Sequence, residues 1–395
     1  MNSQHSFDVI VIGAGPAGST ASYILASHGQ KVLLLDKHIF PRDKLCGGLL
    51  TWKTVRLLET IFKTTPNELK SQGLIRFKSS KYIVTNHLDE SISGQMDYPF
   101  HFIERRSYDF FWLNMAQAAG VEFKAGEKMV DIDPHESRIK TSEGNVYHGR
   151  FIIGADGVFS QIRKRLIKKE LIRDTRYSAL GTALEIVIPK DEASRLPDHP
   201  IISYGYIPWG YAWSFPRRHA RVIGICAANI KAGKQLKDGF YSFLDSNGIS
   251  NSKAIVPKGH ALPLGNYLDI PGFRNILLAG DACGLADPFL GEGIYYAHKS
   301  AQLAVSAIID SSHHPNLALE KYRQQLHQKI IVELKYANIG RRIIFSLPGN
   351  WPYKVLHMLL KLMPRICAET IHGQRTFKWL RRVNREFAEK EIFII

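Results

Sequence analysis

The chain is poor in cysteine and has no long apolar run. Its 395 residues include four cysteines, and their spacing shows no pairing pattern. Such sparse cysteine is typical of a reducing compartment and excludes a disulfide framework. No stretch approaches the ~20 apolar residues that span a bilayer, and no basic and apolar leader precedes the first expected strand. These absences predict a cytoplasmic protein without a transmembrane helix.

Acidic residues are also scarce. The chain has 52 Lys and Arg against 36 Asp and Glu, a net charge of +16. Residues 341–395 hold eleven Lys or Arg against four Glu, so this part contributes 11 − 4 = +7. Such an excess attracts nucleic acid, anionic lipid or an acidic substrate. Because no zinc-finger spacing or other nucleic-acid motif accompanies it, we expect neither a nucleic-acid partner nor a metal site.

A strand-helix-strand unit occupies residues 7–37. An apolar strand at 7–12 leads into a glycine-rich turn, a helix runs to about His28, and a second strand ends on Asp36. The turn consists of Gly13, Ala14, Gly15, Pro16, Ala17 and Gly18. This arrangement predicts a dinucleotide whose diphosphate lies at the helix N-terminus and whose ribose binds the acid. The alternative is a tight turn in a doubly wound sheet without a ligand.

A glycine loop follows the second strand. Residues 40–49 read FPRDKLCGGL, with Gly47 and Gly48 directly after Cys46. Paired glycines at this place favour a backbone that lies flat against a planar group. The alternative is a flexible linker.

Two later strand ends predict contacts with the same ligand. A buried strand at 151–154 ends in a turn at Asp156, and another at 275–280 ends on Asp281. Gly291 and Gly293 then open a helix to about residue 309, a second helix N-terminus aimed at this ligand. No second glycine fingerprint occurs, so a separate nicotinamide-binding domain is not expected.

The remaining segments read mostly as short antiparallel strands at 74–102 and 177–270. Six aromatic residues fall within 204–216, which indicates either a sheet core or a slot for a flat or apolar ligand. The pattern predicts three regions: a discontinuous dinucleotide-binding domain, a β-sheet substrate domain and a basic helical C-terminal region. Their bounds are 1–73, 103–176 and 271–325 for the first, 74–102 and 177–270 for the second, and 326–395 for the third.

Taken together, the motifs resemble the flavoproteins of p-hydroxybenzoate hydroxylase-like fold, over residues 7 to about 310. The match comprises the glycine fingerprint, Asp156-Gly157-x-x-Ser160-x-x-Arg163, and Gly280-Asp281 followed by Pro288 and Gly291. The resemblance implies an α/β protein with a Rossmann-type FAD-binding domain, an antiparallel substrate domain and FAD as cofactor. The implied cofactor contacts are Gly13, Gly15, Pro16, Ala17, Gly18, Asp36, Lys37, Arg42, Cys46, Gly47, Gly48, Arg105, Met129, Asp156, Gly157, Gly280, Asp281, Gly291, Gly293 and Ile294.

Within that fold, two stretches look like the geranylgeranyl reductase family. They are Phe40-Pro41-Arg42-x-Lys44-x-Cys46-Gly47-Gly48 and Tyr211-x-Trp213-x-Phe215-Pro216. The resemblance implies reduction of carbon–carbon double bonds in a polyprenyl lipid, with Tyr211, Trp213, Phe215 and Pro216 in the substrate slot. The chain departs from the family pattern at Cys226, where a second glycine is expected, and at Asp36, which is more often Glu.

The implied reaction needs a proton donor, because an isolated alkene is not polarised and hydride transfer from flavin N5 requires a proton at the other carbon. Cys46 is the candidate donor or gate, since it is the ionisable side chain directly before the paired glycines. The alternative is a small buried packing residue. The electron donor is expected to be NAD(P)H or a ferredoxin-type protein.

The C-terminal region predicts a membrane contact. In the helix expected at 351–363, Lys354, His357 and Lys361 share one narrow face and the rest is largely apolar. A basic stripe on an apolar helix suits peripheral attachment to anionic lipid on the inner face of the membrane. The alternative is a helix packed on the substrate domain with its charges in water. Rival functions are an FAD-dependent aromatic monooxygenase and a non-catalytic membrane-associated flavoprotein.

Overall fold

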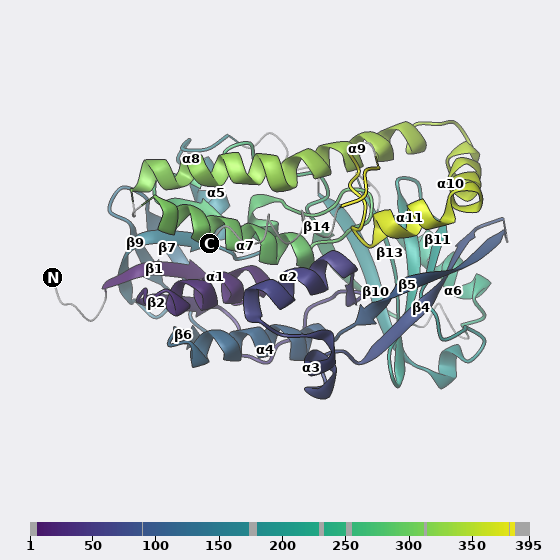
Figure 1. Ribbon diagram of the computed structural model, residues 1–395, viewed down its shortest axis with the longest axis horizontal. Coiled ribbons are helices and arrows are strands. Elements are labelled where there is room, and N and C mark those ends of the chain that lie inside the picture. The colour runs from purple at the N-terminus through teal and green to yellow at the C-terminus, as the bar shows by residue number, and fades with distance from the viewer. Residues whose placement is uncertain are drawn as a thin grey trace.

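The computed structural model describes residues 6–88, 90–173, 180–228, 233–249, 255–311, 314–378 and 380–383. Two sheets lie side by side, one covered by helices and containing the N-terminal strand, the other formed mainly by the middle of the chain (Figure 1). A long helical segment crosses both units and folds back over the second (Figure 1). The expected fold class is confirmed, and the three domain boundaries remain a prediction.

The first sheet is built around β1 (Ser6–Ile12), which pairs in parallel with β2 (Val32–Asp36) and β9 (Val146–Gly154). Its other strands are β6 (Glu122–Ala125), β7 (Met129–Asp133), β8 (Arg138–Thr141), β15 (Gly272–Phe273) and β16 (Ile276–Leu278). The order β15-β16-β9-β1-β2-β6 brings the carboxyl ends of five parallel strands to one edge. Ligands of doubly wound sheets bind at this edge.

Helices cover this sheet. They are α1 (Pro16–Ser27), α2 (Trp52–Phe62), α3 (Pro66–Ser71), α4 (Arg105–Ala118), α5 (Gln161–Lys168) and α7 (Ile294–Asp310). Small residues let α1 lie close to the strands, and a Cβ added at Gly18 would be only 1.7 Å from the carbonyl oxygen of Gly13. Gly18 therefore has the packing task expected of the third glycine of the fingerprint.

The second sheet has the order β14-β10-β13-β12-β11-β4-β5-β3. Its strands are β3 (Leu49–Leu50), β4 (Phe77–Asn86), β5 (Ser91–Phe102), β10 (Gly181–Pro189), β11 (Ile201–Tyr204), β12 (Gly210–Pro216), β13 (Ala220–Ala227) and β14 (Lys258–Leu262). The neighbours are antiparallel except β4 and β11. Because side chains alternate along each strand, one face of this sheet points toward the first unit and the other points away.

Helix α6 (Gly233–Ser246) covers the outward face, although the stretch containing it was expected to form mostly strands. Leu236, Phe240 and Phe243 of α6 are buried against Ile223 and Ile225 of β13. Their spacing of four and three residues is a helical signal, so the strand expectation is wrong for this part of the stretch.

Helix α8 (Pro315–Leu326) leads into the C-terminal region and continues through a π-helical turn at His327–Ile331 into α9 (Val332–Phe345). Helices α10 (Trp351–Leu362) and α11 (Pro364–Ile371) then fold back onto the inward face of the second sheet. Leu360 and Ala368 share a buried cluster there with Trp213 and Phe215. Within the described part of the chain, every helix is too short or too polar to cross a bilayer.

Candidate functional site

A continuous cavity of about 660 Å³ lies between the carboxyl edge of the first sheet and the inward face of the second. The predicted cofactor residues that line it are Gly13, Gly15, Pro16, Ala17, Asp36, Lys37, Arg42, Cys46, Gly47, Gly48, Arg105, Met129, Asp156, Gly157, Asp281, Gly291, Gly293 and Ile294. Tyr211, Trp213 and Phe215, predicted for the substrate, line the same cavity. Gly18, Gly280 and Pro216 lie outside its lining.

The N-terminus of α1 opens into one end of this cavity. Gly15 is its N-cap, no side chain caps the helix, and the first turn carries no acid. The first-turn amides therefore lack intrahelical partners and present a partial positive charge to an anion. A Cβ at Gly15 would meet only Arg42, at 3.5 Å from Nη2. The approach to this helix end is thus open and flanked by a guanidinium group.

Asp36 fixes the turn in front of α1. Its carboxylate accepts hydrogen bonds from the amide of Ala14 at 2.7 Å and from the amide of His38 at 2.8 Å. The side chain is buried and borders the cavity. A carboxylate has more than two acceptor positions, so the predicted bond to a ribose hydroxyl is compatible with these contacts and remains a prediction.

Two guanidinium groups beside this end share one carboxylate. Arg105 Nε and Nη2 each lie 2.7 Å from an oxygen of Asp109, and Arg42 Nη2 lies 3.1 Å from the same carboxylate. Burial acts to lower the pKa of Arg105, but Asp109 raises it overall. The group of three carries a net positive charge, which suits a diphosphate. Sequence reasoning missed Asp109, although its i,i+4 spacing from Arg105 was a signal.

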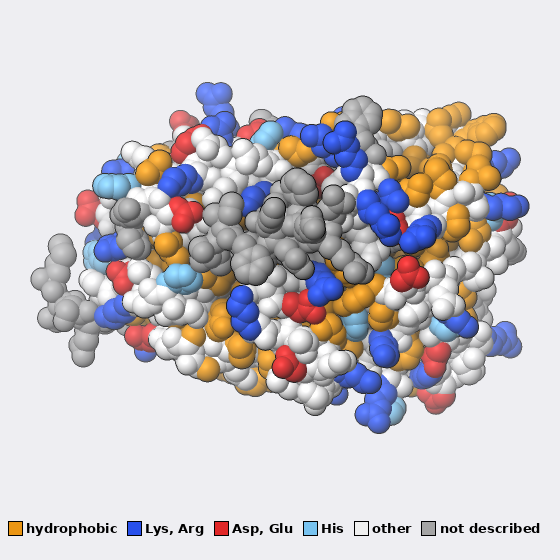
Figure 2. Space-filling view, in the orientation of Figure 1, with side chains coloured by type: hydrophobic (Ala, Val, Ile, Leu, Met, Phe, Trp, Pro, Cys, Tyr) orange, Lys and Arg blue, Asp and Glu red, His pale blue; other side chains and the backbone are white. Residues whose placement is uncertain are grey.

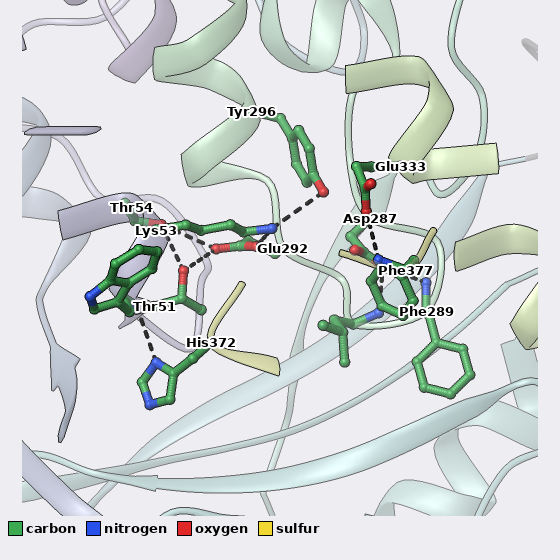
Figure 3. A network of polar contacts seen from close by, with 12 residues as sticks. Thr51, Lys53, Thr54, Asp287, Phe289, Glu292, Tyr296, Glu333, His372 and Phe377 are labelled. Carbon is green, nitrogen blue, oxygen red and sulfur yellow. Dashed lines mark hydrogen bonds and ion pairs between the residues drawn. The ribbon is translucent and has the colours of Figure 1, made fainter. Parts of the chain in front are cut away.

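The second helix N-terminus, that of α7, is tied to α2 by Glu292 (Figure 3). Glu292 Oε1 accepts hydrogen bonds from the hydroxyl groups of Thr51, at 2.6 Å, and Thr54, at 3.1 Å. Its Oε2 lies 2.6 Å from Lys53 Nζ. Burial acts to lower the pKa of Lys53, but Glu292 raises it overall. The turn at 291–293 is therefore anchored to the helix that follows the glycine loop.

The C-terminal region braces the same helix (Figure 3). The amide of Trp52 donates a hydrogen bond to His372 Nδ1 at 3.1 Å, and the amide of Lys53 donates to the carbonyl of His372. Burial lowers the pKa of His372 to about 3, so its ring is neutral and Nδ1 can accept. The ring stacks on Phe100 of β5, with centroids 4.1 Å apart. No pattern in the sequence predicted this contact across 320 residues.

The glycine loop is held firmly, which disfavours the flexible-linker alternative. The amide of Ile103 donates to the carbonyl of Gly48 at 2.8 Å, and the amide of Gly48 donates to Cys46 Sγ at 3.4 Å. Gly48 has φ +76°, and a Cβ there would lie 2.1 Å from the oxygen of Ile103. A Cβ at Gly47 would lie 2.8 Å from the ring of Phe215. Both positions therefore require glycine.

The inward face of the second sheet forms the apolar end of the cavity. The indole of Trp213 packs directly on Gly224, and a Cβ at Gly224 would lie 2.2 Å from Cζ2 of Trp213. The hydroxyl of Tyr211 donates to the carbonyl of Leu290 and so joins β12 to the turn before α7. Cys226 is buried here, and burial raises the pKa of its thiol to about 12. Other apolar lining residues are Ile202, Tyr204, Leu262 and Ile371.

A polar group that sequence reasoning did not assemble lies between the two ends. Glu185 of β10 borders the cavity, and its Oε1 accepts a hydrogen bond from the amide of Cys46 at 3.2 Å. Beside it, Lys44 Nζ lies 2.9 Å from His260 Nε2. Burial lowers the pKa of Lys44 and lowers that of His260 to about 4. Lys44 belongs to the loop motif, whereas Glu185 and His260 are isolated in the sequence and became visible only through strand pairing.

The residues fit an FAD molecule lying along this cavity. Two uncapped helix N-termini and the Arg42–Arg105 pair suit its diphosphate and the electron-rich edge of a reduced ring. At Gly47 and Gly48 the loop backbone packs closely against Phe215 and Ile103, so the loop presents bare backbone at this wall of the cavity. Asp156 Oδ1 is buried without a partner among the described residues, which is costly unless a ligand or water satisfies it.

Comparisons with known proteins agree with this geometry. Residues 6–187 match the family model of the FAD binding domain. The chain is 30% identical over 371 residues to an uncharacterised protein of Methanosarcina barkeri, covering 92% of this chain and 90% of that one. It is 29% identical to the geranylgeranyl diphosphate reductase of Rhodobacter capsulatus, covering 76% and 74% of the two chains.

Among solved structures, the fold is similar to a geranylgeranyl bacteriochlorophyll reductase-like protein from Thermoplasma acidophilum. The TM-score is 0.77 at 19% identity, over 95% of this chain and 98% of the other. Because the identity is low, this likeness concerns the fold. It covers a larger share of the chain than the part, residues 7 to about 310, that resembled the general flavoprotein fold.

Proposed function

Because this chain belongs to the geranylgeranyl reductase family of FAD-dependent oxidoreductases, we propose that it reduces carbon–carbon double bonds of an isoprenoid lipid. Bound FAD, once reduced, supplies the hydride. We propose NAD(P)H or a ferredoxin-type protein as the source of its electrons. The chain itself supplies the binding surface, the exclusion of water and the proton.

The observation that carries this proposal is the continuity of the two ends of the cavity. The glycine loop at Gly47 lies against Phe215, so the dinucleotide end and the aromatic end share one wall. Mainly apolar side chains from β11, β12, β14 and α11 line the aromatic end of the cavity. Such a chamber favours a flexible hydrocarbon over a polar substrate because burial of apolar area drives its binding.

Cys46 lies where it can act on such a substrate. It borders the cavity in the loop between the dinucleotide end and the aromatic end, and it is half-buried as a free thiol. We propose that alkene reduction depends on Cys46, as proton donor or as the gate that admits the chain. Cys46 also packs against the core of the first unit, so the packing alternative and a role at the cavity are compatible.

The test is the mass of the product. The purified protein, reconstituted with FAD and reduced anaerobically with dithionite, is mixed with geranylgeranyl diphosphate, a prenylated glycerophospholipid or menaquinone. The proposal expects products heavier by two hydrogens per double bond and reoxidation of the flavin. Addition of one oxygen in the presence of NAD(P)H and air would identify an aromatic or lipid monooxygenase instead. Absence of substrate-dependent reoxidation with every lipid would favour a non-catalytic flavoprotein.

We also propose that the protein attaches peripherally to an anionic membrane through α9 and α10. The outward side of these helices exposes Ile339, Ile343, Trp351, Met358 and Leu362, and apolar side chains gather around α10 in the space-filling view (Figure 2). Lys354 and Lys361 are exposed on the same helix.

This exposed side combines the features of an interfacial helix. Lys354 Nζ lies 5.7 Å from the ring centre of Trp351. A lysine next to a tryptophan is suited to the headgroup region of a lipid bilayer. The helix also packs on the second sheet through Leu360. The two alternatives considered for this helix are therefore compatible. His357, expected in the basic stripe, is half-buried, with Nδ1 3.9 Å from Glu90.

A further inference from the structure

Glu185 is a carboxyl group on an otherwise largely apolar wall. It lies in β10, paired with Gly224 of β13 and Lys258 of β14, and its side chain is on the inward face of the sheet with 5% exposure. Among the described residues, no Lys, Arg or His forms an ion pair with Glu185, and the two arginines that act on it, Arg217 and Arg105, do so at longer range. A buried carboxylate without a cation is costly. Its presence at this wall therefore calls for a chemical reason.

The surroundings of Glu185 favour the protonated form. Burial raises its pKa to about 7, against the lowering effects of the Cys46 amide, Arg217 and Arg105. The Lys44–His260 pair faces the same part of the cavity from the loop and from β14. At neutral pH a large fraction of Glu185 thus holds a proton inside the chamber, next to the loop that carries Cys46.

We propose that Glu185 is the acid that protonates one carbon of the substrate double bond. This inference rests on the proposed function. The π electron pair forms a C–H bond with the carboxyl proton at one carbon, while hydride from the reduced flavin forms the C–H bond at the other. The alkene is reduced, the flavin is oxidised, and Glu185 is left as a carboxylate that regains a proton from water. Cys46 then acts as the gate.

Geometry supports this assignment. Oε1 of Glu185 is already engaged by the Cys46 amide, so the second oxygen is the one that can carry the proton toward a bound chain. A carboxylic acid with a pKa near the working pH is both populated and acidic enough to protonate a weak base.

The activity test uses the FAD-loaded protein with the substrate that gives a two-hydrogen product. We expect the rate of flavin reoxidation in single turnovers to fall tenfold per pH unit above about pH 7. Glu185→Gln keeps the hydrogen bond with Cys46 but should lower this rate by on the order of 100-fold or more. In this variant the decline of the rate above about pH 7, the alkaline limb of the pH profile, should be absent. Glu185→Asp should restore part of the rate with a shifted limb. Glu333→Gln, which changes a partly buried carboxyl of α9 outside the cavity, should keep the wild-type profile.

A second readout does not depend on turnover. Infrared difference spectra of the holoenzyme between pH 5 and pH 9 should show a protonated carboxyl band that titrates near pH 7 and is missing in Glu185→Gln. An unchanged rate and limb in Glu185→Gln, or retention of the band, would overturn the inference and return the proton to Cys46. A wild-type protein that reduces no prenyl lipid would instead remove the proposed function, and the role of Glu185 with it.

Discussion

Cys46 is a residue whose chemistry and packing can be separated. The backbone amide of Cys46 donates a hydrogen bond to Glu185, and its Sγ accepts one from the amide of Gly48. The thiol thus contributes only one weak hydrogen bond to the loop. We expect Cys46→Ala to bind FAD with wild-type affinity and to lose alkene reduction because the gate at the glycine loop is lost, whereas Cys46→Ser keeps part of it. Flavin fluorescence titration measures the binding, and product mass measures the reduction. Full turnover by the alanine variant would exclude Cys46 from the reaction.

Glu185 also has a consequence for stability. Its pKa rises from 4.5 to about 7 in the folded protein, so the folded state binds its proton more tightly than the unfolded state. The carboxylate form of Glu185 is therefore unfavourable in the folded protein. This free-energy cost is absent at pH 4.5 and below, grows as the pH rises, and reaches its full size above about pH 7. At about 1.4 kcal/mol per unit, the free energy of unfolding loses roughly 3 kcal/mol across this range.

Glu185→Gln should therefore be more stable than wild type at pH 8 and similar to it at pH 5. Denaturant unfolding of the FAD-saturated proteins at both pH values measures the difference. Equal stability of the two proteins at pH 8 would show that the carboxylate is solvated or paired in solution.

Individual residues show how far the sequence could predict the site. The glycines at 13, 47, 48 and 291 were predictable because each stands in a motif whose backbone requirement has a local cause. Glu185 and His260 were not, because each is a lone polar residue on a strand whose partners are set by long-range pairing. Asp109 was partly predictable: its spacing of four residues from Arg105 is visible in the sequence, whereas its contact with Arg42 is not.

At the scale of elements, the largely buried pair of Lys53 and Glu292, with side chains 15% and 9% accessible, connects α2 with the turn before α7. Glu292→Gln leaves the Lys53 charge without its counter-charge, which we expect to cost about 3–5 kcal/mol of unfolding free energy. FAD affinity should fall as well, because the turn at 291–293 and the glycine loop lose their shared anchor. Thermal unfolding and flavin fluorescence measure the two effects.

The same helix offers the control. Arg56 and Glu59 of α2 form a pair of 2.7 Å that is more exposed than the pair of Lys53 and Glu292, with 49% and 23% of the side chains accessible. Glu59→Gln should change stability by less than about 1 kcal/mol and leave FAD affinity unchanged. The double variant with Lys53→Met and Glu292→Gln should recover much of the loss, since it removes both charges together. An equal loss from Glu59→Gln and Glu292→Gln would contradict the anchoring role.

Elements with strong local signals were predictable from the sequence, and those defined by tertiary context were less so. The unit from β1 to β2 has a continuous apolar strand, a glycine turn and a terminal acid, and each of its parts was found. Helix α6 was missed within a stretch rich in strands, although its apolar spacing was present. The docking of α11 on α2 through His372 could not be predicted, because a single polar contact has no periodic signal.

At the scale of the whole molecule, the exposed side of α9 and α10 lies on the part of the protein that also covers the apolar end of the cavity. Ile371 of α11 borders the cavity, and Leu360 of α10 packs in the cluster behind it. A bilayer in contact with the outer side would lie close to the apolar chamber, so a prenyl chain could pass from lipid into the protein with little exposure to water.

Removal of residues 341–395 is a poor test of this contact, because it would also delete Leu360 and Ala368 and so uncover Trp213 and Phe215 of the same cluster. Three exposed positions allow a cleaner change. Trp351, Met358 and Leu362 are 59%, 49% and 70% exposed, so their replacement by serine should leave the fold intact. At about 1 kcal/mol or more for each apolar side chain taken out of water, the triple variant should bind anionic vesicles on the order of 100-fold more weakly.

The control is a triple serine variant at Val187, Val256 and Leu317, which are exposed apolar residues outside α9 and α10, and it should bind as wild type does. Lys354→Gln with Lys361→Gln should weaken binding to anionic vesicles by about 1 kcal/mol per lysine but leave binding to neutral vesicles unchanged. Vesicle co-sedimentation measures all four proteins. Equal binding by the wild type and the triple variant at 351, 358 and 362 would place the lipid contact elsewhere, and with it the route by which a membrane substrate reaches the cavity.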